Sequence, residues 1–162
     1  MSFKSGDSAV YPGCGVGVVR EIAQIDLGEG TTEMYVIQFP DDGTKVWVPT
    51  FAAQEQGMRT VMNVKKVEET YSAIRRQALP ERLATWNRRF RTYSEKIQTN
   101  DPKEMGEVLG ELAAIKNAKH LSFGERRIFR KVHSLLVREM AIALDTKEDT
   151  ISEKLAAIIR EI

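Results

Sequence analysis

The chain has 162 residues, of which 42% are hydrophobic, and a formal net charge of +1. This composition fits one soluble domain or two small ones, and no apolar run approaches the roughly 18 residues that a membrane helix needs. The single cysteine, Cys14, excludes an intramolecular disulfide, and the N-terminus lacks the apolar core of a signal peptide, so we expect a cytoplasmic protein.

The charges are distributed unevenly along the chain. Residues 1–60 have a net charge of −4, residues 61–100 of +5 and residues 101–162 of 0. An acidic first part beside a basic middle suggests two surfaces with different partners. The alternative is that the basic stretch is a solvated helix face, and charge alone does not decide between the two.

The first part of the chain has the signals of a small β-structure. Short apolar stretches bounded by glycine, proline or aspartate predict strands over residues 9–12, 15–22, 33–39, 44–49 and 59–61. Several short strands joined by turns are typical of a small barrel. We therefore expect a Tudor-like or SH3-like barrel over residues 1–61.

From residue 62 onward the apolar positions follow a helical period. The predicted helices run from about 62 to 78, from 80 or 85 to about 98, from 102, from 122 to about 144, and from about 149 to 162. Asp101 before Pro102 is a strong helix start, Ser122 with Glu125 matches a capping box, and residues 146–149 are expected to cap the last helix. The second domain, residues 62–162, is thus expected to be all-helical, which makes the chain an α+β protein.

The residues that usually carry catalysis or bind metals form no recognisable pattern. The two histidines, His120 and His133, and the single cysteine have no metal-ligand spacing. The glycines of residues 13–17 lack the spacing of a dinucleotide or phosphate loop, so a glycine-bent strand is the better interpretation. We expect no enzyme activity, no cofactor and no metal.

Trp86 stands among three arginines, Arg88, Arg89 and Arg91, where a helix is expected to begin. Arginines neutralise phosphates, and an aromatic ring can stack on a base or wedge beside one. This run therefore predicts a DNA contact.

Packing is the competing interpretation of the same run. Trp86, Phe90, Tyr93 and Ile97 are spaced by four, three and four residues, which puts them on one face of a helix. In that case Trp86 is the first core residue of an amphipathic helix. For Arg89, three residues after Trp86, packing is likewise the alternative to a DNA contact.

Six short segments, in order along the chain, carry a further signal. They are Phe3-Lys4-Ser5-Gly6-Asp7, Ala9-Val10-Tyr11-Pro12, Gly15-Val16-Gly17, Val48-Pro49, Trp86-Asn87-Arg88-Arg89-Phe90 and Leu121-Ser122-Phe123-Gly124-Glu125-Arg126. Each segment alone is weak, but their order and spacing are specific. Over essentially its whole length, the chain resembles the CarD/CdnL family of bacterial transcription regulators.

The resemblance implies that the two domains bind different partners. The Tudor-like domain, similar to a module of the transcription-repair coupling factor, would bind the β subunit of RNA polymerase. The helical domain would touch promoter DNA in the minor groove beside the upstream edge of the −10 element. There Trp86 would act as a wedge, with Arg88, Arg89 and Arg91 nearby, and would prolong the open complex. We expect a monomer that reaches the nucleoid through the polymerase.

The resemblance also places the polymerase contact around Ile37 and the segment 44–49, in particular Lys45, Trp47 and Pro49. Family members often have arginine or methionine at the position of Trp47. Alternation along a strand puts Val46 and Val48 on the face opposite Trp47. If the valines fill the barrel, Trp47 points outward, where an exposed tryptophan is a good hot-spot candidate.

Two other functions remain open at this point. A general DNA-binding protein that acts without polymerase would usually be more basic than this chain. A Tudor-like adaptor could bind a protein partner while its helical domain serves only as scaffold. A fully buried Trp86 would favour the adaptor.

Overall fold

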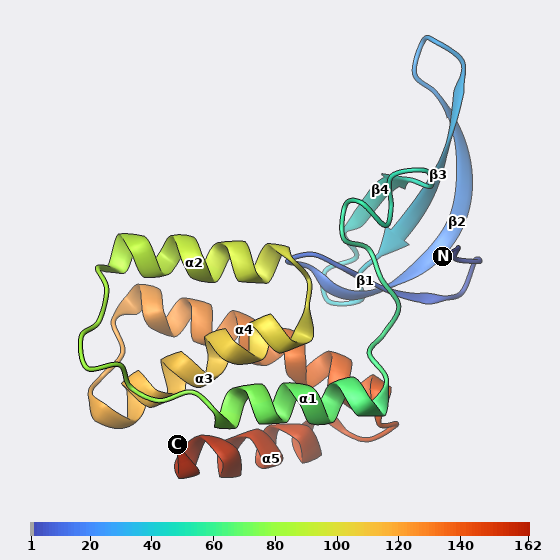
Figure 1. Cartoon of the computed structure of the whole chain (residues 1–162). Helices are drawn as coiled ribbons and strands as arrows, with labels where there is room; N and C mark the ends of the chain where they lie inside the picture. Colours follow the sequence, from blue (N-terminus) through green and yellow to red (C-terminus); the bar gives the residue numbers. More distant parts are fainter. Residues whose placement is uncertain (1) are drawn as a thin grey trace. The chain divides into compact units, whose positions relative to one another are not determined.

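In the computed structural model, which describes residues 2–162, the chain divides between Val61 and Met62 into a β-rich unit and a helical unit. The β-rich unit is an antiparallel sheet of four strands in the order β1-β2-β3-β4, curled into a half-barrel (Figure 1). Its strands are β1 (Ser8–Tyr11), β2 (Gly15–Asp26), β3 (Thr31–Gln38) and β4 (Lys45–Pro49). The predicted Tudor-like architecture of the first domain is confirmed.

The prediction of a fifth strand over residues 59–61 was wrong. Only an isolated bridge forms there, in which Val10 and Arg59 exchange two backbone hydrogen bonds of 2.8 and 3.0 Å. The chain then leaves the sheet, because the first helix begins at Val64.

The concave side of the sheet holds the core of the β-rich unit, which includes Val19, Tyr35, Ile37 and Val48. Gly17 is required there, since a Cβ at this position would lie only 2.6 Å from Cγ2 of Ile37. Beyond the stretch that β1 covers, β2 and β3 continue together as a two-stranded arm, which Figure 1 shows projecting from the sheet.

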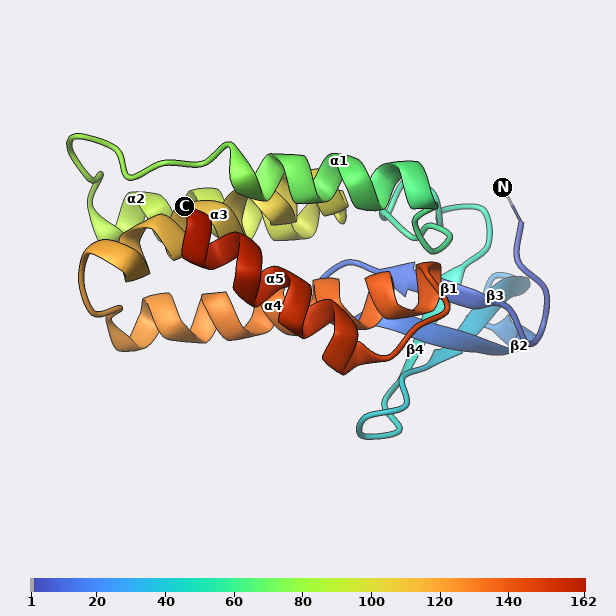
Figure 2. The ribbon, with the colours of Figure 1, turned by 90° about the horizontal axis from the view of Figure 1, so that it is seen from below.

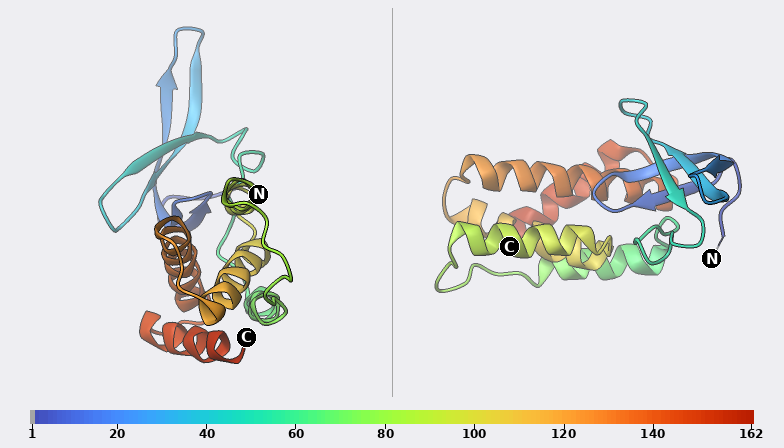
Figure 3. Two further views of the ribbon diagram at one scale, coloured as in Figure 1. Left: turned by 90° about the vertical axis from the view of Figure 1, so that its left-hand side faces the viewer. Right: turned by 90° about the horizontal axis from the view of Figure 1, so that it is seen from above.

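The helical unit contains α1 (Val64–Arg75), α2 (Trp86–Gln98), α3 (Pro102–Ala118), α4 (Phe123–Ala143) and α5 (Glu148–Glu161). Helix α3 lies in the middle and contacts each of the other four (Figure 3, left). Helix α5 packs against α1, α3 and α4 on one side of the bundle (Figure 2). The predicted all-helical second domain is thus observed.

Two of the three predicted helix caps form as expected. The Asp101 side chain accepts a hydrogen bond from the Lys103 N–H, and Ser122 forms the full capping box with Glu125. The expected side-chain cap of the last helix is missing, because Lys147 occupies the cap position and makes no such bond.

The buried face of α2 differs from the predicted one. It consists of Arg89, Tyr93 and Ile97, which are spaced by four residues. Phe90 lies about 100° further round the helix than Arg89 and is 51% exposed, so the packing interpretation does not hold for this residue.

Candidate nucleic-acid interface

Trp86 is the first residue of α2, and the preceding residue fixes where the helix begins. The Thr85 side chain accepts a hydrogen bond from the Arg88 N–H, at 3.4 Å, and so caps the helix. The Trp86 ring is half-buried and packs against the edge of the core, next to the rings of Phe90 and Tyr93. The two interpretations of Trp86, core packing and DNA contact, are therefore compatible, because one part of the indole packs while another part faces solvent.

A glycine on α4 makes room for the indole. A Cβ on Gly124 would lie 2.6 Å from Cζ2 of Trp86 and 3.1 Å from Cε2. Real Cβ atoms essentially never approach a neighbour so closely, so a larger residue there would displace the ring. This contact also places the first turns of α2 and α4 side by side (Figure 1).

Arg89 holds the same two helices together by an ion pair. Its Nη1 donates to Oε2 of Glu125 at 2.8 Å, and its Nε donates to the Ala84 carbonyl at 3.2 Å. The guanidinium also lies 5.3 Å from the centre of the Trp86 ring, a cation–π distance. Both partners of the ion pair are buried. The structure thus supports the packing role for Arg89, and the DNA contact of this side chain stays a prediction.

The partner of Arg89, Glu125, is also the acid of the capping box on α4. Burial would raise the pKa of the Glu125 carboxyl, but the hydrogen bond from the Ser122 backbone and the contact with Arg89 outweigh it and hold the pKa below its usual value. The carboxylate is consequently charged at neutral pH, where it stabilises both the helix start and the arginine.

Arg88 and Arg91 remain available at the surface. Arg88 is exposed, and it forms no ion pair within residues 2–162. Arg91 is 81% exposed, and its one carboxylate contact is a loose one of 3.7 Å to Glu95, one turn further along α2. An exposed pair of this kind contributes little and is readily exchanged for a phosphate.

A second set of residues, to which the sequence analysis assigned no contact, lies at the start of α4. Phe123, Arg126, Arg127 and Arg130 line a surface hollow of about 460 Å³, and Phe123 is 75% exposed. Gly124, which lies against Trp86, directly follows Phe123, so the indole and this hollow both lie at the first turns of α4. We call Trp86, Arg88, Arg91 and these four residues the basic-aromatic face. These four residues could have been found from the sequence, because the spacing 123, 126, 127, 130 puts them on one face of a predicted helix.

The predicted polymerase-contact residues lie on or next to β4. Trp47 is 50% exposed, Val48 is fully buried and Val46 packs against the core, so the predicted outward orientation of Trp47 is confirmed. Lys45 is exposed at the start of the strand and Pro49 is half-buried at its end. Ile37 does not belong to this surface, because β3 lies between β2 and β4 and the Ile37 side chain is fully buried.

Comparison with known sequences identifies the family on both domains. The CarD-like/TRCF RID domain matches residues 3–62, and the CarD C-terminal domain matches residues 69–156. The chain belongs to the CarD family. A relative from Bacillus subtilis (strain 168), named "Putative transcription factor YdeB", is 26% identical over 140 residues, which cover 86% of this chain and 91% of that protein.

The family assignment confirms the resemblance seen in the sequence and makes the chain a CarD-like transcription factor. Within residues 2–162, no three histidine, cysteine or acidic side chains gather as metal ligands would. In the same described part of the chain, no helix is long and apolar enough to cross a membrane. The CarD-family chain thus presents two candidate contact surfaces, namely β4 and the basic-aromatic face.

Proposed function

We propose that this chain regulates transcription by binding the β subunit of RNA polymerase with its first domain. The helical domain then stabilises the open promoter complex by contacting the minor groove near the upstream edge of the −10 element. In this proposal Trp86 is the wedge and Arg88 and Arg91 hold the flanking phosphates. The chain performs no chemical step.

The observation that carries the proposal is the position of Trp86. Its indole is fixed on one side by Gly124 and Arg89, while the rest of the ring faces solvent among unpaired or loosely paired arginines. A wedge needs a ring that is held rigidly and yet protrudes, because a mobile ring would lose entropy on insertion. Unstacking one base step costs a few kcal/mol, which such a ring offsets.

Phosphate contacts supply the remainder of the DNA binding. Each neutralised phosphate adds about −0.9 to the slope of log K against log salt concentration. The exposed arginines of the basic-aromatic face come from two helices, namely Arg88 and Arg91 from α2 and three from α4. Phe123 adds a further exposed ring to this face.

A small number of phosphate contacts gives only weak binding to free DNA. The polymerase contact is therefore essential to the proposal. Docking of the first domain on the β subunit raises the effective concentration of the wedge at the promoter. Strand β4 suits this docking because it is an edge of the sheet, whose outward backbone groups can pair with a strand of the partner. Trp47 then anchors the contact through its exposed ring.

A Tudor-like adaptor with a purely structural helical domain is the alternative. It would be favoured by a fully buried Trp86, whereas the indole is only partly buried. The basic-aromatic face would also have no purpose in a scaffold.

The full chain and purified RNA polymerase test the proposal in two measurements. A crosslinking or pull-down assay against the separate subunits should retain β, and a competitor-challenge assay should show a longer open-complex lifetime when the chain is present. Binding to β without any change in lifetime would favour the adaptor, and binding to DNA alone would contradict the docking step.

A further inference from the structure

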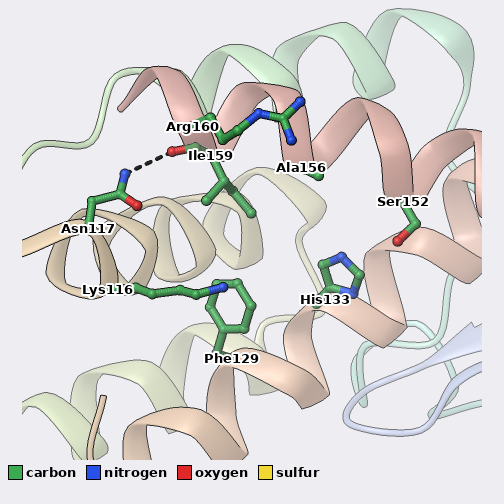
Figure 4. A pocket seen from close by; sticks show the side chains of 8 residues that line it. All are labelled: Lys116, Asn117, Phe129, His133, Ser152, Ala156, Ile159 and Arg160. Carbon is green, nitrogen blue, oxygen red and sulfur yellow. Dashed lines mark hydrogen bonds between the residues drawn. The ribbon is translucent and has the colours of Figure 1, made fainter. Parts of the chain in front are cut away.

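The ring of Phe123, at the start of α4, is 75% exposed, so most of its surface is open to solvent. Within residues 2–162, no other ring stacks on it and no cation lies over it. Phe129, further along the same helix, is different. The Lys116 Nζ lies 5.1 Å from the centre of the Phe129 ring, and the ring of His133 stacks with it (Figure 4). Of these two rings, Phe123 is therefore the one on which a ligand can stack.

Three arginines of α4 lie on the same side of the helix as Phe123. Arg126, Arg127 and Arg130 follow it by three, four and seven residues, which places the four side chains within an arc of about 100° around the helix axis. Together they line the hollow of about 460 Å³ described above, which we call the α4 hollow. All three arginines are exposed, and none forms an ion pair within residues 2–162.

The α4 hollow has no acidic lining residue. Glu125, the acid in this stretch of the helix, is buried and accepts a hydrogen bond from Nη1 of Arg89 at 2.8 Å. Arg130 is three residues from Arg127 and four from Arg126, so these side chains are direct neighbours on the helix surface and repel each other. A ligand with several negative charges relieves this repulsion. The α4 hollow therefore suits a polyanion.

An open aromatic ring beside a row of cations is the arrangement that binds single-stranded nucleic acid. The cations follow the phosphates, and the ring stacks on a base, because every base has a flat π-face. In an intact duplex these faces are covered by the neighbouring bases, so an unpaired base suits the ring better. The volume of the α4 hollow falls within the roughly 300 to 1,000 Å³ of small-ligand sites, which leaves room for one base.

We propose that the α4 hollow binds single-stranded DNA, with one unpaired base stacked on Phe123 and the adjoining phosphates held by the three arginines. This inference rests on the proposed function, which puts the chain at the upstream edge of the melted region. Gly124, the residue after Phe123, lies against the indole of Trp86. The wedge and the stacking ring thus belong to neighbouring positions. Trp86 holds the last base step of the duplex, and Phe123 receives an unpaired base beyond it.

The test uses the full chain, labelled with ¹⁵N, without polymerase. The probes are a short oligothymidylate, an abasic strand with the same number of phosphates, and a hairpin duplex with the same number of phosphates. We expect saturable shifts of the amide signals of Phe123, Gly124, Arg127 and Arg130 with the oligothymidylate. Its Kd should be about tenfold lower than that of either other probe, because stacking of one base is worth roughly 5- to 150-fold in affinity.

Substitutions at exposed positions locate the binding. Phe123→Leu should raise the Kd of the oligothymidylate about tenfold, and Phe123→Trp should preserve the affinity, because the indole also stacks. Phe51→Leu, at an exposed phenylalanine of the first domain, is the matched control. Arg127→Gln and Arg130→Gln should each reduce the salt slope by about 0.7, whereas Arg160→Gln, at an exposed arginine of α5, should leave it unchanged. Thermal unfolding of each variant shows whether it is folded.

Three results would overturn the proposal. These are equal affinity for the abasic strand, tighter binding of the duplex than of the single strand, and equal shifts with polyglutamate of the same charge, which would make the hollow a general polyanion site. Each of them leaves the Trp86 wedge untouched. A chain that binds the oligothymidylate as expected but does not prolong the open complex would contradict the proposed function instead.

Discussion

The indole of Trp86 covers Gly124 so closely that a Cβ on this glycine would lie 2.6 Å from Cζ2 of the ring. The two residues belong to the first turns of different helices, α2 and α4. This contact, together with Arg89, determines how far the proposed wedge stands out from the helical domain.

Replacing Gly124 by alanine should therefore move the indole. The alanine would favour the α4 helix by about 1 kcal/mol, but the clash costs about 1–3 kcal/mol unless the ring rotates outward. We expect near-normal stability, a red-shifted Trp86 fluorescence in a Trp47→Phe background, and a shorter open complex. An unshifted emission spectrum would contradict the proposed contact.

Trp86→Leu separates packing from stacking. Leucine keeps much of the apolar contact with the core, so the free energy of unfolding should fall by about 1.5 kcal/mol or less. It cannot stack on a base, which is worth about 1–3 kcal/mol, and open-complex lifetime should fall by roughly one to two decades at most. Phe90→Leu, on the same helix, is the matched control. A normal lifetime in the folded Trp86→Leu variant would exclude the wedge.

Arg88→Ala and Arg91→Ala should weaken the DNA contact by similar amounts at every promoter, because phosphate contacts carry no sequence information. Each should reduce the salt slope by about 0.9 without loss of stability. Arg89→Ala is the contrasting variant, since it leaves Glu125 buried without its partner and should cost about 3 kcal/mol of unfolding free energy. Lifetimes measured on several promoters check the first expectation, and urea unfolding checks the second. Strongly promoter-selective losses would point to base contacts instead.

The Glu125 carboxyl should contribute to the pH dependence of stability. Its pKa is lower in the folded chain than in the unfolded chain, so its contribution is present above about pH 4.3 and is lost as pH falls through the folded pKa. Glu125→Gln should therefore be less stable than the original chain at pH 7, and the difference should shrink in acid. Denaturation at a series of pH values measures this difference. Glu104→Gln, in the first turn of α3, is the control, and a difference independent of pH would contradict the assignment.

Trp47→Glu should abolish binding to the β subunit while the first domain stays folded. The side chain is half-exposed, so its loss should change stability by only about 0.5 kcal/mol, whereas a buried interface anchor is worth about 2 kcal/mol or more. Calorimetry against β, together with circular dichroism, measures both effects. Leu27→Glu, at the exposed end of the β2–β3 arm, should bind normally. Unchanged affinity of a folded Trp47→Glu variant would move the interface elsewhere on the domain.

The sequence by itself determined the features that depend on near neighbours. The capping box of Ser122 and Glu125 and the cap of Asp101 are local hydrogen-bond patterns, and both appear as predicted. Strand alternation places Trp47 on the face opposite Val46 and Val48, so it points outward once the two valines are assigned to the barrel interior. The division into a β half-barrel and a helical part follows from the change of hydrophobic period.

Only the tertiary structure decided which side chains meet across long distances in the sequence. Arg89 is 36 residues from Glu125, and no local pattern shows that this arginine is buried while Arg88 and Arg91 are exposed. Ile37 is buried because its side chain packs into the core of the β-rich unit, and Phe90 is exposed because α2 turns Tyr93 and Ile97 toward α3. Periodicity defines a face of a helix or strand, but the packing of distant elements selects which face is covered.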